Sequence, residues 1–86
     1  PTIKELPNEY RFFFYSFDCN EPVHVHVQKG KKVCKFWLEP IALSKNFGFS
    51  SKDLNNIRKI IQKYHTHIME LGMNIAAETY EPRLYD

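Results

Sequence analysis

The chain has 86 residues, of which 43% are hydrophobic and 15% aromatic, and its formal net charge is +2. Since domains usually contain ~100 to 150 residues, this length predicts a single domain over residues 1–86. The composition is typical of a folded globule, and no apolar run approaches the ~20 residues of a membrane-spanning helix. We therefore expect a soluble protein with a small core rich in phenylalanine and tyrosine.

The cysteine content indicates a reducing compartment. Cys19 and Cys34 are too few for the disulfide framework of a small secreted domain. The sequence also lacks a positively charged start followed by an apolar stretch, so it predicts no signal peptide. We expect a cytoplasmic protein in which Cys34 is a small core residue and Cys19 lies in a loop.

Three extended segments precede the helical part of the chain. Residues 10–17 (YRFFFYSF) are aromatic on both faces and predict a central strand that is covered on both sides. Residues 23–28 alternate valine with polar side chains, and residues 33–38 return as their antiparallel partner after the flexible pair Lys29-Gly30. The segment 41–49 is ambiguous between a helical turn and an edge strand.

A helical pattern follows at residues 51–71. Ser50 and Asp53 resemble a capping box in which aspartate takes the usual glutamate position, and Gly72 is a natural helix stop. These features predict an α+β fold: an antiparallel sheet of three or more strands with one long amphipathic helix packed on its valine face. Residues 72–86 then form an acidic C-terminal extension. The apolar stripe of the helix consists of Leu54, Ile57, Ile61, Tyr64, Ile68 and Leu71.

The register of the hairpin decides which side chains accompany His24 and His26, which project from one face roughly 7 Å apart. A two-residue turn at Lys29-Gly30 sets His26 opposite Val33. The same turn sets His24 opposite Lys35, and a four-residue loop shifts these partners but keeps the faces. A three-residue loop would exchange the two faces. We favour an even register, because it gathers Val23, Val25, Val27, Cys34, Phe36 and Leu38 on one apolar face and leaves His24, His26, Lys35 and Trp37 on the other.

The histidine face is open to several interpretations. Two neutral imidazoles can bind a transition metal, with Glu21 or Asp18 completing the site, although we expect no metal and no other cofactor. Two imidazoles and the Lys35 ammonium can also cleave RNA through a ribose 2′-hydroxyl as acid, base and charge stabiliser. The face can instead be a binding surface, or its histidines can be ordinary polar strand residues that cover Trp37.

Candidate substrate contacts surround this face. Arg11 in the first long strand can make a bidentate phosphate contact, and Trp37 can anchor a ligand. The lysines of the hairpin suit phosphate binding or simply a solvated turn. Residues 70–86 carry a net charge of −3 against +5 for residues 1–69, so the extension could screen the hairpin. The candidate hairpin lysines are Lys29, Lys31 and Lys32.

Residues 1–71 resemble a small bacterial family catalogued as domain of unknown function 4160. The most specific matches are RFFFYS at residues 11–16, EP at 21–22 followed by HVHV at 24–27, and KFWL at 35–38 with Pro40. Val23 stands where the family usually has a second proline, and this change leaves the histidine spacing intact.

The resemblance implies a partner. Members of this family are typically encoded beside a small second protein, in pairs considered toxin and antitoxin modules, with this component as the toxin. We therefore expect a toxin-like protein with a cognate antitoxin-like partner. The resemblance does not choose the chemistry, and from the side chains of the histidine face we expect action on RNA as a metal-independent ribonuclease through His24, His26 and Lys35. The alternative is a non-enzymatic module that docks a partner protein on the His/Trp face.

Overall fold

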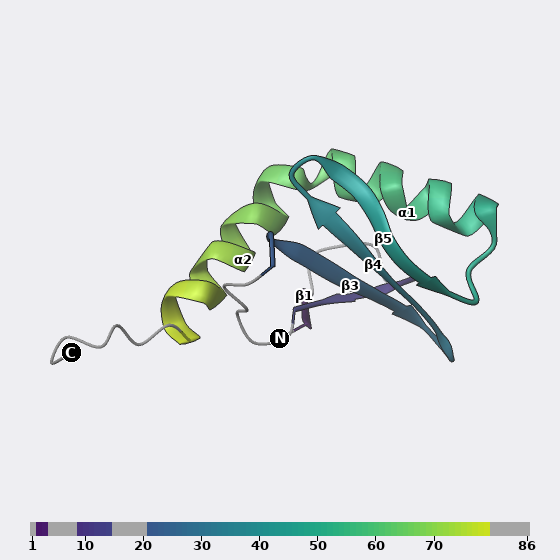
Figure 1. Cartoon of the computed structure of the whole chain (residues 1–86), viewed down its shortest axis with the longest axis horizontal. Coiled ribbons are helices and arrows are strands. Elements are labelled where there is room, and N and C mark those ends of the chain that lie inside the picture. Colours follow the sequence, from purple (N-terminus) through teal and green to yellow (C-terminus); the bar gives the residue numbers. More distant parts are fainter. Residues whose placement is uncertain (1, 4–8, 15–20, 80–86) are drawn as a thin grey trace, which may run out of the picture.

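The computed structural model describes residues 2–3, 9–14 and 21–79, with side chains described in 9–14 and 21–72. Within this part the fold is α+β, as predicted: one antiparallel sheet with helices on a single face (Figure 1). The strands follow one another in chain order across the sheet. The elements are β1 (Thr2–Ile3), β2 (Arg11–Phe13), β3 (His24–Lys29), β4 (Lys32–Leu38), β5 (Ile41–Phe47), α1 (Ser51–Lys63) and α2 (His65–Thr79).

The core lies between the sheet and the helices. Val25, Val27 and Phe36 are fully buried on the face predicted to be apolar, and Val23 packs against them. Because strand side chains alternate between faces, burial of this set leaves the histidines on the opposite face. The other buried members of this core are Tyr10, Phe12, Phe14, Cys34, Leu38, Phe49, Ile57, Ile61 and Ile68.

The β3–β4 hairpin has the even register but a different turn from the one predicted. Lys29 pairs with Lys32, so Gly30 and Lys31 form the two-residue turn. Gly30 has a φ of 62°, which suits the first central position of a tight hairpin turn. The observed turn begins one residue later than the predicted turn. Each residue of β3 therefore pairs with a β4 residue two positions further along the chain, and both faces keep their predicted side chains.

Strand β5 resolves the ambiguous segment and contains an irregularity. Phe36 pairs with Leu43 whereas Lys35 pairs with Lys45, so Ser44 is an extra residue on β5. Such a bulge reverses the side-chain alternation beyond it. Lys45 and Phe47 consequently share the face of Lys35, and Phe47 is 64% exposed.

The helical region differs from the prediction of one long helix. Tyr64 has φ −106° and ψ 21° and separates α1 from α2, although its N–H still donates to the Ile60 carbonyl. At the bend, His65 Nε2 donates to the Leu38 carbonyl at 2.6 Å, which ties the start of α2 to the end of β4. The apolar stripe continues through the bend, so its periodicity gave no signal of a break.

Gly72 does not end the helix, because α2 continues to Thr79. It lies where the helix comes close to the sheet. A Cβ at this position would lie 3.2 Å from ring carbons of Phe14 and 3.4 Å from a methyl of Val23. The glycine therefore allows close packing rather than supplying a stop.

The predicted start of the first helix is confirmed in part. The Asp53 N–H donates to Ser50 Oγ at 3.1 Å, which is the expected N-cap bond. The Asp53 carboxylate accepts a hydrogen bond from the Tyr10 hydroxyl at 3.0 Å, and burial together with this bond raises the pKa of Tyr10. The cap thereby joins α1 to the segment before β2.

Some expectations lie outside the described residues. These are the continuation of the first strand through 15–17, the position of Cys19, and the end of the acidic extension at 80–86. In the part of the chain that is described, no helix has the length and apolar character needed to cross a membrane.

Candidate functional site

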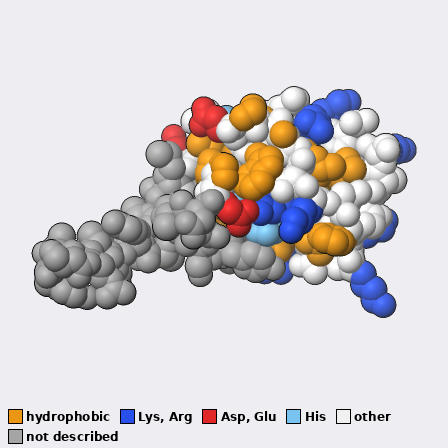
Figure 2. Space-filling view, viewed as in Figure 1, with side chains coloured by type: hydrophobic (Ala, Val, Ile, Leu, Met, Phe, Trp, Pro, Cys, Tyr) orange, Lys and Arg blue, Asp and Glu red, His pale blue; other side chains and the backbone are white. Residues whose placement is uncertain are grey.

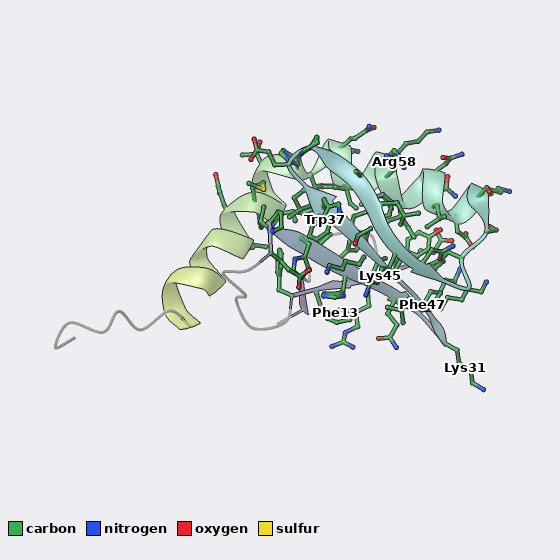
Figure 3. The ribbon with its side chains drawn as sticks, in the orientation of Figure 1. Phe13, Lys31, Trp37, Lys45, Phe47 and Arg58 are labelled. Carbon is green, nitrogen blue, oxygen red and sulfur yellow. The ribbon has the colours of Figure 1, made fainter. Side chains whose placement is uncertain are left out.

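The candidate site is the sheet face that lies opposite the helices, which we call the outer face. Strand pairing places on it Arg11 and Phe13 from β2, together with the histidines of β3. Strands β4 and β5 add charged and aromatic side chains, several of which are labelled in Figure 3. The outer face comprises Arg11, Phe13, His24, His26, Gln28, Val33, Lys35, Trp37, Ala42, Lys45 and Phe47.

An aromatic row crosses three strands of this face. The ring of Phe13 stacks on His26 with centroids 5.4 Å apart and an interplanar angle of 23°. His26 meets His24 edge to face at 5.2 Å, and His24 meets Trp37 in the same way at 5.6 Å. Rings in these arrangements attract one another beyond their simple burial. The four rings therefore hold the two histidines in fixed relative positions.

Lys35 joins the aromatic row to a carboxylate. Its Nζ lies 4.6 Å from the centroid of the Trp37 ring, a cation–π geometry. The same ammonium forms an ion pair with Glu21, the residue that precedes Pro22 at the entrance to β3. The side chain of Lys35 is only 13% exposed, so its ammonium is largely shielded from water. Figure 2 shows histidine, basic and acidic side chains together on this side of the molecule.

The ring orientation of His24 is set by the backbone. Its Nδ1 lies 2.9 Å from the Pro22 carbonyl, and since a carbonyl can only accept, Nδ1 carries the hydrogen. In the neutral ring the lone pair then belongs to Nε2. His24 can therefore act as a base or as an acceptor through Nε2.

His26 is held in its neutral form. Burial, followed by the neighbouring His24 and Lys35, lowers the pKa of His26 from 6.5 to about 4. At neutral pH the ring is consequently an uncharged aromatic side chain. The sequence-based mechanism needs one imidazolium and one imidazole, and His26 does not supply the imidazolium there.

The predicted residues are brought together only in part. Arg11 lies on the outer face, donates to Gln28 Oε1 at 3.2 Å and covers the Phe13 ring at 4.7 Å. With His24, His26, Lys35 and Trp37 it forms one continuous surface. The sequence predicted a common face for the four hairpin side chains, and the pairing of β2 with β3 adds Arg11 to it.

The hairpin lysines do not belong to that surface. Lys29 pairs with Glu9 at 3.3 Å, and Lys32 lies 4.0 Å from Asp53 on α1. By strand alternation, both lysines lie on the same side of the sheet as the apolar face. Lys31 points away from the sheet at the tip of the hairpin (Figure 3).

Sequence reasoning missed other members of the outer face. Phe13 was predicted only as part of a strand covered on both sides, although its alternation with Phe12 indicates that it faces the histidines. Lys45 and Phe47 were missed because the segment 41–49 was ambiguous in the sequence, and the bulge at Ser44 then sets their orientation. Glu21 was considered as a metal ligand and is the ion-pair partner of Lys35.

The described part of the chain groups no three His, Cys, Asp or Glu side chains in a way that could hold a metal ion. Asp18, the other carboxylate suggested for such a site, lies outside the described residues.

Cys34 is a buried free thiol, and burial raises its pKa to about 12, as suits an unreactive core residue.

The fold and the outer face define a small α+β domain with a basic and aromatic sheet surface. A family model described as Domain of unknown function (DUF4160) matches residues 10–71. This span is more than half of the chain, so the protein belongs to that family. It includes every residue of the outer face. No curated protein and no solved structure matched the chain.

Proposed function

We propose that this protein binds single-stranded RNA on its outer face, as the toxin-like component of a two-component bacterial module. The observation that carries the proposal is the interleaving of cations with aromatic rings on one side of the sheet. The cross-strand pair Lys35 and Lys45 supplies positive charge between the rings of Trp37 and Phe47. Arg11 adds a further cation over the ring of Phe13. Proteins bind single strands by placing phosphates on cations and stacking bases on aromatic side chains.

The module role rests on the family resemblance, in which a small antitoxin-like protein is the partner. Co-expression with the product of the neighbouring gene tests it directly. We expect the chain alone to slow growth and the partner to relieve this effect. Normal growth of cells expressing the folded chain alone would contradict the toxin-like role.

RNA binding is tested with a labelled single-stranded oligonucleotide at several salt concentrations. Lys45→Ser should weaken binding and reduce the salt slope by about 0.7, the value for one phosphate contact on a single strand. Lys59→Ser removes another exposed lysine from α1, on the opposite side of the sheet, and should leave the slope unchanged. Equal effects of the two variants would mean that the attraction comes from net charge alone.

The aromatic contribution is tested by Trp37→Ala and Phe47→Ala. Loss of one stacked base costs about 1 to 3 kcal/mol, or roughly 5- to 150-fold in affinity. If oligonucleotides do not bind at low salt, while these variants lose the complex with the neighbouring gene's product, the outer face is a protein-docking surface instead.

Cleavage is a second candidate function, favoured by the orientation of His24. Its Nε2 lone pair can take the proton of a 2′-hydroxyl as O2′ bonds to phosphorus and the P–O5′ bond breaks. The Lys35 ammonium offsets charge on the phosphate, and water supplies the proton for the leaving 5′-oxygen. General-base assistance is worth ~10² to 10⁴ in rate, so His24→Ala should remove most cleavage. His26→Ala should act mainly through the position of the His24 ring. RNA that stays intact between about pH 5 and pH 9 with purified protein would leave binding as the function.

A further inference from the structure

The ion pair between Lys35 and Glu21 occupies the centre of the proposed RNA surface. Among the ion pairs of the described residues, it contains the lysine with the lowest exposure, 13%, against 47% for Lys29 in its pair with Glu9. The Glu21 side chain is 37% exposed. One partner is therefore held within the face while the other reaches solvent.

The surroundings of the ammonium restrict what can replace Glu21. The Trp37 ring lies beside Lys35 Nζ, and the aromatic row continues from that ring through His24. An ammonium in such a poorly hydrated place requires a negative partner, because an unpaired charge there is costly. A neutral ligand group could not take the carboxylate's position, whereas a phosphate oxygen could.

We propose that Lys35 is a subsite for one phosphate group, and that Glu21 covers this subsite until the phosphate displaces it. The inference rests on the proposed binding of RNA and identifies where one backbone phosphate is held. Glu21 thereby opposes the binding of weakly attached anions. A phosphate that is anchored by neighbouring contacts to Arg11 or Lys45 competes with the carboxylate more effectively.

The position of Glu21 allows such a displacement. It precedes Pro22, whose carbonyl holds the His24 ring, and it lies before the first residue of β3. A rotation of its side chain toward solvent breaks no strand pairing. The aromatic row and the core therefore stay in place while the carboxylate leaves.

The test compares Glu21→Gln with Glu9→Gln in oligonucleotide binding. Each variant removes one carboxylate from a lysine pair and raises the net charge equally, so Glu9→Gln controls for the general electrostatic gain. Close charge pairs commonly couple by more than 1.4 kcal/mol, which is about tenfold in affinity. We expect Glu21→Gln to tighten binding about tenfold more than Glu9→Gln does.

A second readout does not depend on RNA. Trp37 is the single tryptophan of the chain, and its emission reports the position of the neighbouring ammonium. Titration with inorganic phosphate should change this emission at lower concentrations in Glu21→Gln than in the wild type. The double variant Glu21→Gln/Lys35→Gln should show no saturable change. Urea unfolding of each variant establishes first that it is folded.

The outcomes separate the two proposals. Oligonucleotide binding with equal gains in Glu21→Gln and Glu9→Gln would overturn the subsite and leave RNA binding standing. A phosphate response that requires Lys35, without any oligonucleotide binding, would support the subsite for a free phosphate ligand and overturn the RNA function. Loss of both responses would overturn both.

Discussion

The low pKa of His26 predicts a specific dependence of stability on pH. In the folded chain the ring binds a proton only near pH 4, whereas in the unfolded chain it does so near pH 6.5. Between these values the unfolded state holds more protons than the folded state. The free energy of unfolding is therefore greatest above about pH 6.5 and decreases as the pH falls toward about 4.

The size of this effect follows from the pKa difference. At about 1.4 kcal/mol per pH unit, the difference between 6.5 and about 4 sets an upper bound of roughly 3 to 4 kcal/mol. The ring is partly exposed, so water screens the charge and the actual loss is smaller. We expect His26 to account for about 1 to 2 kcal/mol of lost stability by pH 4.5.

The assay is urea unfolding of the wild type and of His26→Phe at several pH values between 7.5 and 4.5. Phenylalanine keeps an aromatic ring against Phe13 and His24 but cannot be protonated. The variant's stability should fall less with decreasing pH, whatever its absolute value at neutral pH. His26→Gln serves the same purpose if phenylalanine is too large. Parallel curves for the wild type and both variants would refute the reasoning.

Three further predictions concern the fold. Phe36→Ala should cost about 3 to 5 kcal/mol, a large part of the 5 to 15 kcal/mol typical of domains, and circular dichroism should show partial or complete unfolding at room temperature. Ser50→Ala should lower stability by about 1 kcal/mol in urea, since the first turn of α1 loses its cap; an unchanged midpoint would argue against that bond. Gly72→Ala should destabilise the protein despite the ~1 kcal/mol advantage of alanine in a helix, because the new methyl would crowd Phe14. A stabilised Gly72→Ala variant would show that α2 moves away from the sheet at little cost.

The two faces of the sheet could be predicted from the sequence because residues 23–28 alternate strictly and an even register gathers one apolar face across the hairpin. Any even shift of register keeps Val25 and Phe36 on the same face of the sheet, and it keeps His24 and Lys35 together on the other face. The cross-strand partners could not be predicted, since Lys29-Gly30 and Gly30-Lys31 are both acceptable two-residue turns. His26 consequently lies opposite Lys35, where the predicted turn placed Val33.

The sequence predicted which side of the helical region is buried, but it did not predict that the region is divided into two helices. Ile57, Ile61 and Ile68 are buried on one side across both helices, as their spacing indicated. The bend at Tyr64 coincides with the bond between His65 and the Leu38 carbonyl, a contact between residues far apart in the sequence. Local periodicity does not contain such information, and tertiary contacts override it.

The composition of the outer face depends on one inserted residue. In a regular β5, Ala42 would stay on the outer face, whereas Lys45 and Phe47 would lie on the helix side, away from Lys35 and Trp37. Ser44 is an extra residue on β5 that has no pairing partner on β4, so the side chains of Lys45 and Phe47 point to the outer face. Asn46 then turns to the inner side, and its amide exchanges two hydrogen bonds of 3.0 Å with the Phe49 backbone. The bulge thus adds a cation and an aromatic ring to the surface that already contains Lys35 and Trp37, and bulges in edge strands commonly orient side chains near functional sites.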